Sequence, residues 1–334
     1  GDVSTSYYKN GLANSKLTWE RTQEFNIGLD FGFFRNRING SLDVYQRTSK
    51  DLIMERQLPS TTGWTSVWDN IGKVRNTGLE LSINTINVQT SDFSWQTNII
   101  FDTNKNEILE LYGGKKDDIG NKWFIGEAIN VNYDYEFDGI WQTSEADKAA
   151  IYGQTLGQVK VKDQNHDNVI DAKDKVILGQ QLPKWTGSIT NTFTYKNWDL
   201  AFNVYTRQGA QLNSTFVSSF MAYDGNYNQA KVDYWTETNP TNKYPQPGNK
   251  GKYFSSMCYQ DVSFVRVGYI TLGYTFPMSL LKPIGIKRLK LYATANNPFL
   301  FTSFKGFDPE WATQNTWGEA TSTRTFLFGV KLAF

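Results

Sequence analysis

Apolar and polar residues alternate with a period of two along much of the chain. The first clear run places Phe25, Ile27 and Leu29 on one face, with polar or small residues between them. Such alternation indicates a β-strand whose two faces meet different environments. The sequence therefore predicts an all-β protein with antiparallel strands. Nine segments follow the pattern, at about 25–33, 38–45, 79–83, 93–102, 185–195, 198–205, 262–276, 289–296 and 326–334.

Several of these strands are long, and both of their faces are distinctive. Runs of about 10–15 residues exceed the 5–6 typical of globular strands. The second face carries small and polar residues, and large aromatic residues gather near the strand ends. This pattern is typical of an antiparallel transmembrane β-barrel with a polar lumen. We therefore expect two faces. The residues expected to face lipid are Ile189, Phe193, Leu200, Phe202, Leu289 and Leu291, and those expected to face the lumen are Thr190, Asn203, Lys290 and Thr294.

The connections between the expected strands alternate in length. Short connections lie near 35–37, 87–92, 196–197 and 277–286, and long ones at about 50–70, 103–131, 143–184, 206–258 and 297–322. Outer-membrane barrels have short periplasmic turns and long extracellular loops. We therefore expect Phe334 on the periplasmic side and Asp163 outside. Residues 122–142 are ambiguous, because they supply either two further strands or an ordered part of a loop. Nine or eleven strands that begin outside predict part of a larger barrel.

The amino-acid composition excludes several other classes of protein. The formal net charge of +1 implies no nucleic-acid surface. Cys258 is the single cysteine and His166 the single histidine, which excludes a disulfide framework and a histidine-cluster metal site and disfavours a Ser-His-Asp triad. No apolar run reaches the roughly 18 residues of a membrane-spanning helix, and no signal peptide is visible at the start. We find no nucleophile constellation and no phosphate-binding glycine loop, and predict that the protein is not an enzyme.

Residues 163–174 have the spacing of an EF-hand loop. Side-chain oxygens occur at positions 1, 3, 5, 9 and 12, and position 7 offers a backbone carbonyl. Two positions depart from the pattern, because Asn168 replaces glycine and Asp174 replaces glutamate. Two interpretations stay open: a structural calcium site, or an acidic turn in water. The candidate ligands are Asp163, Asn165, Asp167, Val169, Asp171 and Asp174.

Tryptophans form a second set of candidate binding residues, because they lie in or beside the long connections. Their rings would stack on sugar rings or peptide side chains, or else pack inside the loops or against a lid protein. We favour packing for any single residue. The set is Trp64, Trp68, Trp123, Trp141, Trp235, Trp311 and Trp317.

Several segments together resemble the C-terminal part of the SusC/RagA family, the TonB-linked outer-membrane importers of Bacteroidetes. They occur in family order and span nearly the whole chain: 17–38, Asn76–Leu81, Pro183–Ser188, Val265–Pro277, Leu291–Phe299, Phe304–Glu310 and Phe326–Phe334. The terminal strand, which ends in phenylalanine, also resembles a signal read by the barrel-assembly machinery.

The resemblance implies a 22-stranded barrel of which residues 1–334 supply the last nine to eleven strands, with residues 143–184 as an extracellular loop. It also implies a Gram-negative outer-membrane location, contact with lipid, a SusD-like lipoprotein lid, and an oligosaccharide or peptide ligand. The given sequence contains no plug domain and no TonB-contacting segment, so contact with TonB is expected through a missing N-terminal part.

Two other functions compete with transport. One is a calcium-stabilised carbohydrate-binding β domain of a secreted protein, and the other is a structural adhesin or porin. A soluble β-sandwich is the corresponding alternative fold, although sandwiches seldom carry alternating strands this long with five long loops on one side.

Overall fold

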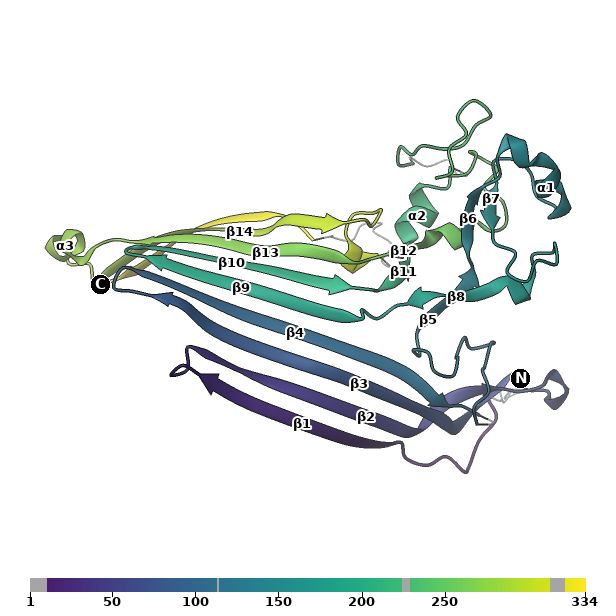
Figure 1. The fold of residues 1–334 in the computed structure, drawn as a ribbon, viewed down its shortest axis with the longest axis horizontal. Coiled ribbons are helices and arrows are strands. Elements are labelled where there is room, and N and C mark those ends of the chain that lie inside the picture. Colours follow the sequence, from purple (N-terminus) through teal and green to yellow (C-terminus); the bar gives the residue numbers. More distant parts are fainter. Residues whose placement is uncertain (1–10, 113, 224–228, 313–321) are drawn as a thin grey trace, which may run out of the picture. The chain divides into compact units, whose positions relative to one another are not determined.

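A computed structural model describes residues 11–112, 114–223, 229–312 and 322–334. Its main feature is a nine-stranded sheet with the order β1-β2-β3-β4-β9-β10-β13-β14-β15 (Figure 1). The strands are β1 (Arg21–Phe33), β2 (Ile38–Gln57), β3 (Ser66–Gln89), β4 (Phe93–Glu110), β9 (Trp185–Tyr195), β10 (Trp198–Gln208), β13 (Phe264–Thr275), β14 (Arg288–Thr302) and β15 (Thr325–Ala333). All nine predicted strands are confirmed.

The chain divides into two compact units. The first takes in the chain up to Leu29, Leu42–Glu80 and Thr103–Val131, and the second takes in Asp30–Ser41, Leu81–Asp102 and Asn132–Phe334. Strands β1 to β4 therefore contribute one end to each unit, whereas β9, β10 and β13 to β15 belong wholly to the second.

In the first unit, the prediction of a long loop at 50–70 is wrong. Strands β2, β3 and β4 run for 20, 24 and 18 residues, which leaves only residues 58–65 between β2 and β3. The predicted loop at 103–131 likewise begins only after Glu110. Charged residues such as Asp51 and Arg56 hide the alternation in these extensions. The extensions are held by a small core of their own: Met54, Val74, Ile108 and Leu111, against Leu52, Ile71, Trp123, Ile125 and Ile129.

In the second unit, the long connections fold into an ordered loop domain. Its paired strands are β5 (Val131–Tyr135) with β8 (Lys175–Gln180), β6 (Phe137–Ile140) with β7 (Val159–Val161), and β11 (Gln211–Asn213) with β12 (Tyr259–Asp261). Residues 122–142 thus add no strand to the large sheet, so the interpretation as an ordered part of a loop is confirmed. Buried residues from distant segments meet in its core: Ile140, Val159, Val161, Val217, Met221, Ala222, Trp235, Tyr253, Phe254 and Cys258.

Helices are few and short. The α-helices are α1 (Ala146–Ile151), α2 (Thr215–Phe220) and α3 (Met278–Leu281). Single 3-10 turns occupy Ser60–Thr62, Thr143–Glu145, Ala172–Asp174, Phe254–Cys258, Lys282–Ile284 and Pro309–Trp311. None of the helices in the described ranges has the length and apolar character needed to cross a bilayer.

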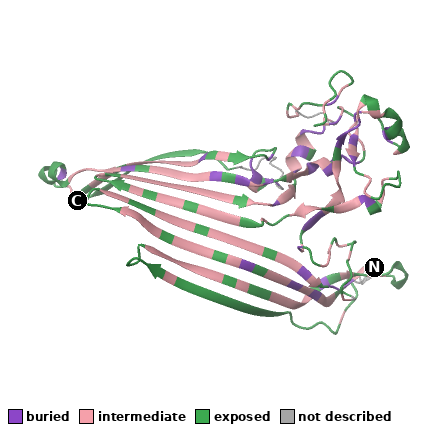
Figure 2. Ribbon diagram, in the orientation of Figure 1, coloured by how far each residue is buried: buried purple, intermediate pink, exposed green. Residues whose placement is uncertain are grey.

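Buried residues gather in the loop domain and on the extensions of β2 to β4, while most of the large sheet is partly or fully exposed (Figure 2). On β15, Phe326 and Phe328 are 68% and 82% exposed. Their cross-strand partners on β14 are Ala295 and Ala293, so these residues share one face. An apolar face left open over several strands is what a lipid-facing surface requires.

The register assigns the expected residues to their faces. Leu200 lies opposite Phe193, and Leu289 opposite Leu332, on the open apolar face. Asn203 lies opposite Thr190, and Thr294 opposite Thr271, on the other. One detail was not predicted. A bulge at Gly268 shifts the pairing of β13 with both of its neighbours, so its apolar face runs Val265, Val267, then Ile270, Leu272.

Candidate functional site

The polar face of the sheet is the first candidate surface. In the second unit, the Asn203 amide donates to the hydroxyls of Ser188 and Thr190, at 2.8 and 2.9 Å. The hydroxyls of Thr271 and Thr294 lie 2.9 Å apart. Short neutral donors and acceptors thus cover this face. Such groups suit the hydroxyls of a glycan or the amides of a peptide equally.

Glycine leaves room for a charged bridge on the same face. Lys290 of β14 pairs with Asp199 of β10 at 2.6 Å, across the intervening strand β13. Gly273 lies beneath this bridge. A Cβ there would meet Lys290 Cε at 2.5 Å and an Asp199 oxygen at 2.7 Å. The absence of a side chain at Gly273 is therefore what lets the two charges meet.

The first unit carries a comparable polar recess. The amides of Asn104 and Asn106 both donate to Asn76 Oδ1, at 3.2 and 3.0 Å. A recess of about 610 Å³ is lined by Glu24, Asn26, Asp43, Tyr45, Arg47, Asn76, Glu80 and Asn104. Only one of these eight side chains is cationic, so a ligand in the recess would meet carboxamides and carboxylates.

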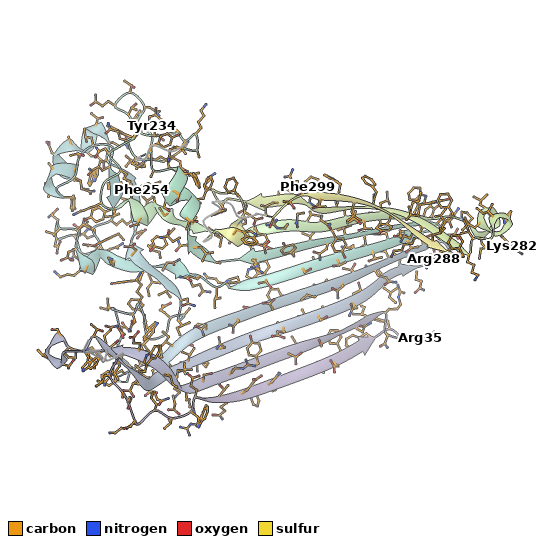
Figure 3. All side chains as sticks on the ribbon, turned by 180° about the vertical axis from the view of Figure 1, so that it is seen from behind. Arg35, Tyr234, Phe254, Lys282, Arg288 and Phe299 are labelled. Carbon is orange, nitrogen blue, oxygen red and sulfur yellow. The ribbon has the colours of Figure 1, made fainter. Side chains whose placement is uncertain are left out.

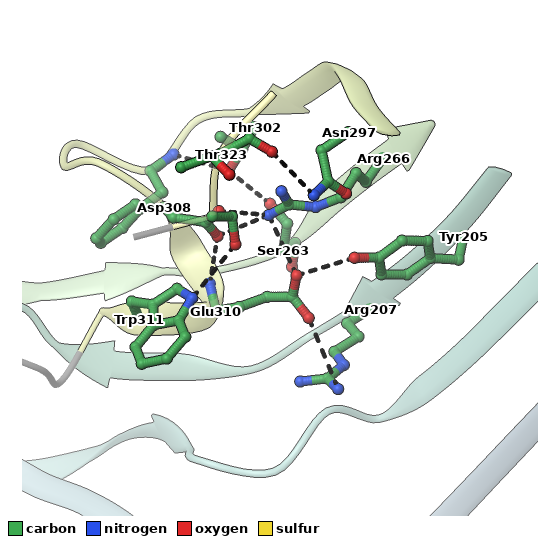
Figure 4. Close-up of polar contacts among 12 residues, drawn as sticks. Tyr205, Arg207, Ser263, Arg266, Asn297, Thr302, Asp308, Glu310, Trp311 and Thr323 are labelled. Atoms are coloured by element: carbon green, nitrogen blue, oxygen red, sulfur yellow. Dashed lines mark hydrogen bonds and ion pairs between the residues drawn. The ribbon is translucent and has the colours of Figure 1, made fainter. Parts of the chain in front are cut away.

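A buried ion-pair network holds residues 304–312 against the sheet (Figure 4). Arg266 Nη2 on β13 lies 2.6 and 2.8 Å from the two carboxylate oxygens of Asp308, and both side chains are 3% exposed. Glu310 lies 3.2 Å from the same nitrogen and accepts a hydrogen bond from the Tyr205 hydroxyl at 2.9 Å. From the sequence, Phe304–Glu310 contributed only to the family resemblance and had no predicted role. The signal that could have revealed it is an arginine set between two valines of a predicted strand, Val265-Arg266-Val267, because a charged residue at such a position needs a partner.

The predicted calcium loop is folded as a series of tight turns. The Asp163 carboxylate accepts the backbone N–H groups of His166 and Asn168, at 2.7 and 2.9 Å. Asp174, which is fully buried, accepts those of Gln164 and Asp171, at 2.9 and 2.8 Å. His166 and Asn168 both adopt positive φ, at 60° and 64°. This fits the expectation that Asn168 takes the place of glycine.

The other candidate ligands are engaged within the same turns. Asn165 donates to Asp167 at 2.9 Å, Asp167 accepts the Val169 N–H at 2.9 Å, and Asp171 accepts the Lys173 N–H at 2.7 Å. Within the described ranges, no group of three or more His, Cys, Asp or Glu side chains converges as a metal site. The calcium site therefore stays a prediction.

Hydrogen bonding sets the charge of Asp163. Burial alone would raise its pKa, but the hydrogen bonds from the Asn168 amide and the Tyr152 hydroxyl prevail and lower that pKa below its ordinary value. These hydrogen bonds therefore favour the charged form of the carboxylate, which is the form that binds calcium.

The loop tryptophans in the described ranges separate into three groups by burial. Trp141 and Trp235 are 2% exposed and donate to Gln154 and Gln142, at 2.9 and 3.1 Å. Packing inside the loop domain, the favoured interpretation, is confirmed for these two. Trp64 and Trp123 are partly buried, and Trp123 packs on the core of the first unit. Trp68 and Trp311 are 53% and 40% exposed, while Trp317 lies outside the described residues.

The sequence from residue 2 to residue 297 matches the family model described as "TonB dependent receptor-like, beta-barrel". The chain belongs to this family. Its sheet is accordingly part of an outer-membrane β-barrel, so the open apolar face is the lipid face and the carboxamide-rich face is the lumen.

Curated relatives point to the same family. The chain is 32% identical over 314 residues to TonB-dependent receptor P26 of Formosa agariphila, covering 89% of this chain and 32% of that protein. It is 30% identical over 349 residues to TonB-dependent receptor SusC of Bacteroides thetaiotaomicron, covering 100% of this chain and 34% of SusC. The chain thus spans about a third of the length of these relatives, which are named as receptors and not as enzymes.

Solved structures share the fold. The RagAB peptide transporter matches with a TM-score of 0.74 at 26% identity, covering 92% of this chain and 35% of that chain. The RagAB peptide importer in its open-open state matches with a TM-score of 0.75 at 25% identity, covering 97% and 36%. The predicted resemblance to the SusC/RagA family is confirmed.

Proposed function

We propose that the complete protein to which this chain belongs imports a glycan or a peptide across the outer membrane, with energy supplied through TonB. The observation that carries this proposal is the polar lumenal face, on which Asn76, Asn104 and Asn203 present carboxamides in a sheet that aligns with SusC along its whole length. Carboxamides both donate and accept hydrogen bonds, so they suit neutral polar chains.

Two features favour peptide or glycan over a small hydrophobic ligand. The polar recess in the first unit is lined by no aliphatic residue. One solved relative is titled a peptide transporter and another relative is named SusC. These names do not separate the two ligand classes for this chain, so a direct uptake measurement has to do so.

A lipoprotein lid of the SusD type is the second part of the proposal. The loop domain gives it a plausible surface, because its core is packed while Tyr234, Ile151 and Val169 stay exposed at 37%, 62% and 55%. Affinity purification of the complete protein from native membranes should recover such a lipoprotein. Recovery of the receptor alone, under mild detergent, would count against it.

The transport proposal is tested by uptake of labelled oligosaccharides and peptides into cells that carry the complete protein. Changing Asn76 and Asn104 together to leucine should slow uptake of the true ligand. Thr85→Val, on the lipid face of the second unit, is the matched control and should leave uptake unchanged. Uptake that persists at the same rate in cells without TonB would refute energy coupling.

A soluble carbohydrate-binding module is less consistent with these features. A soluble domain has to cover its apolar face, yet Phe326, Phe328 and Val330 are 68%, 82% and 63% exposed. A monodisperse protein in the absence of detergent would nevertheless favour that alternative.

We further propose that residues 163–174 bind calcium in a structural role. The EF-hand spacing of the oxygen donors and the positive φ of Asn168 at the glycine position support it. Calorimetry with millimolar calcium should give heat, and calcium should slow proteolysis within the loop. The double variant D163N/D167N removes two charges but keeps oxygen acceptors for the turns, so it should lose the heat and the protection. If the unaltered protein gives neither, the loop is an acidic turn without an ion.

A further inference from the structure

The short connections of the sheet carry a set of cations without ion-pair partners. The turn between β1 and β2 holds Arg35 and Arg37, the turn between β9 and β10 holds Lys196, and the connection between β13 and β14 holds Lys282 and Lys287. Arg288 follows as the first residue of β14. We call these six exposed residues the basic rim. The salt bridges among the described residues include none of them.

The rim lies at one end of the strands, away from the loop domain. In Figure 3, Arg35, Lys282 and Arg288 are at the end with the short turns, while Tyr234 and Phe254 lie at the other. The four short connections contain five of these cations and one carboxylate, Asp92, which leaves an excess of four positive charges, and Arg288 directly follows the last connection. The overall net charge of +1 conceals this local excess.

Cations of the loop domain behave differently. Lys160 pairs with Glu145 at 2.9 Å, Lys175 with Asp134 at 3.5 Å, and Lys243 with Asp233 at 3.1 Å. For these three lysines the chain itself supplies the counter-charge. At the rim it does not, so the partner of the rim has to bring negative charge.

Apolar side chains stand beside the rim cations. In the β13–β14 connection, Met278, Leu280 and Ile284 are 56%, 62% and 66% exposed, while Leu281 is buried and anchors the turn. Exposed apolar groups next to lysine are typical of segments that lie at the boundary between headgroups and acyl chains. A soluble acidic partner would neutralise the charge but would have no use for these apolar side chains.

Aromatic residues mark the same level on the lipid face. Tyr195 and Trp198, on either side of the β9–β10 turn, are 54% and 48% exposed. The Trp198 ring packs at a tilt against Tyr274 of β13, with 4.7 Å between the ring centroids. Tyrosine and tryptophan prefer the headgroup level of a bilayer. The rim cations in the adjoining turns therefore stand at the depth of lipid phosphates.

We propose that the basic rim binds the headgroups of anionic glycerophospholipids in the leaflet that borders the short turns, with Met278, Leu280 and Ile284 placed among their acyl chains. This binding fixes the depth of the barrel in the membrane. It is a property of the surface of the sheet and does not depend on which ligand the lumen carries.

The test uses the complete protein purified in a mild detergent, with native mass spectrometry to count bound lipids. The probes are phosphatidylglycerol, which is anionic, and phosphatidylcholine, which is zwitterionic and has the same acyl chains. The rim variant is K282Q/K287Q/R288Q. The matched control, K115Q/K116Q/K148Q, removes three exposed lysines from the other end of the strands and from the loop domain.

We expect the unaltered protein and the control to bind phosphatidylglycerol in preference to phosphatidylcholine, and the rim variant to lose about tenfold or more in phosphatidylglycerol affinity. The preference should weaken as salt is raised, since exposed charges are screened. Intact barrels are checked by heat-modified migration on gels. Equal binding of both lipids by the unaltered protein, or equal phosphatidylglycerol binding by the rim variant, overturns the proposal. Loss of a co-purifying acidic protein with lipid binding intact makes the rim a protein-docking site and also overturns it.

Discussion

Arg266 of β13 and Asp308 share a bidentate contact through one guanidinium nitrogen, at 2.6 and 2.8 Å, with both side chains 3% exposed. Asp308 also accepts the backbone N–H of Glu310 at 2.9 Å and so caps the short helix Pro309–Trp311. Arg266 and Asp308 are 42 residues apart in the chain, so a strand of the barrel holds a distant segment in place.

Removing one partner of this pair should be costly. R266M leaves the Asp308 carboxylate buried without its cation, which typically costs about 3–5 kcal/mol. We expect a clear fall in the thermal midpoint and faster proteolysis within 303–312. The double variant R266M/D308N keeps an acceptor for the cap and removes the orphaned charge, so it should recover part of the loss. A double variant as unstable as the sum of the single variants would contradict this account.

The two faces of β9 give a second prediction. Ile189 lies on the lipid face at 45% exposed, and Thr190 on the lumenal face accepts a hydrogen bond from Asn203. Ile189→Arg puts a charge in lipid, at a cost of about 2–4 kcal/mol near the midplane. Thr190→Arg, the neighbouring control, should cost about 1 kcal/mol for the lost hydrogen bond. The measurement is equilibrium folding into lipid vesicles, and equal costs for the two variants would invalidate the face assignment.

Gly273 provides a third test. Gly273→Ala places a Cβ 2.5 Å from Lys290 Cε, which has to move away from Asp199. The pair is only partly buried, so we expect a loss of about 1 kcal/mol or less. Lys290→Met should cost about as much, and adding Gly273→Ala to it should cost almost nothing further. A full additional loss in the double variant would show that the glycine serves another purpose.

Cys258 yields a prediction on pH. It is 1% exposed in the core of the loop domain, and burial raises the pKa of its thiol from 9.0 to about 12. The folded state holds the thiol proton where an unfolded chain would release it. This stabilisation is complete below about pH 9 and is lost as the pH rises toward 12.

Alkylation of Cys258 checks this prediction. Iodoacetamide should label the folded protein very slowly at both pH 8 and pH 9, with a rate that rises about tenfold between them, because thiolate is the reactive form and both values lie far below the raised pKa. Denaturant should restore fast labelling. Rapid labelling of the folded protein at pH 8 would place the thiol outside the core.

The alternation of side chains was enough to predict nine strands and the two faces of residues such as Phe193 and Thr190. This succeeds because a period of two is a local property of an extended backbone, and lipid on one side and water on the other make that period visible in the sequence. The EF-hand spacing of residues 163–174 is equally local, which is why it could be proposed from the sequence, although spacing alone does not reveal whether an ion binds.

Only the tertiary structure decided how far the strands extend and what the long connections do. Strands β2 and β3 continue past the expected loop because Met54 and Val74 meet Ile108 in a core whose members are distant in sequence. Trp141 and Trp235 are buried for the same reason. The Arg266–Asp308 pair and the bridge from Lys290 to Asp199 over Gly273 depend on which strands lie side by side. No local period encodes such contacts, since each forms only when segments far apart in the chain are brought together by the sheet.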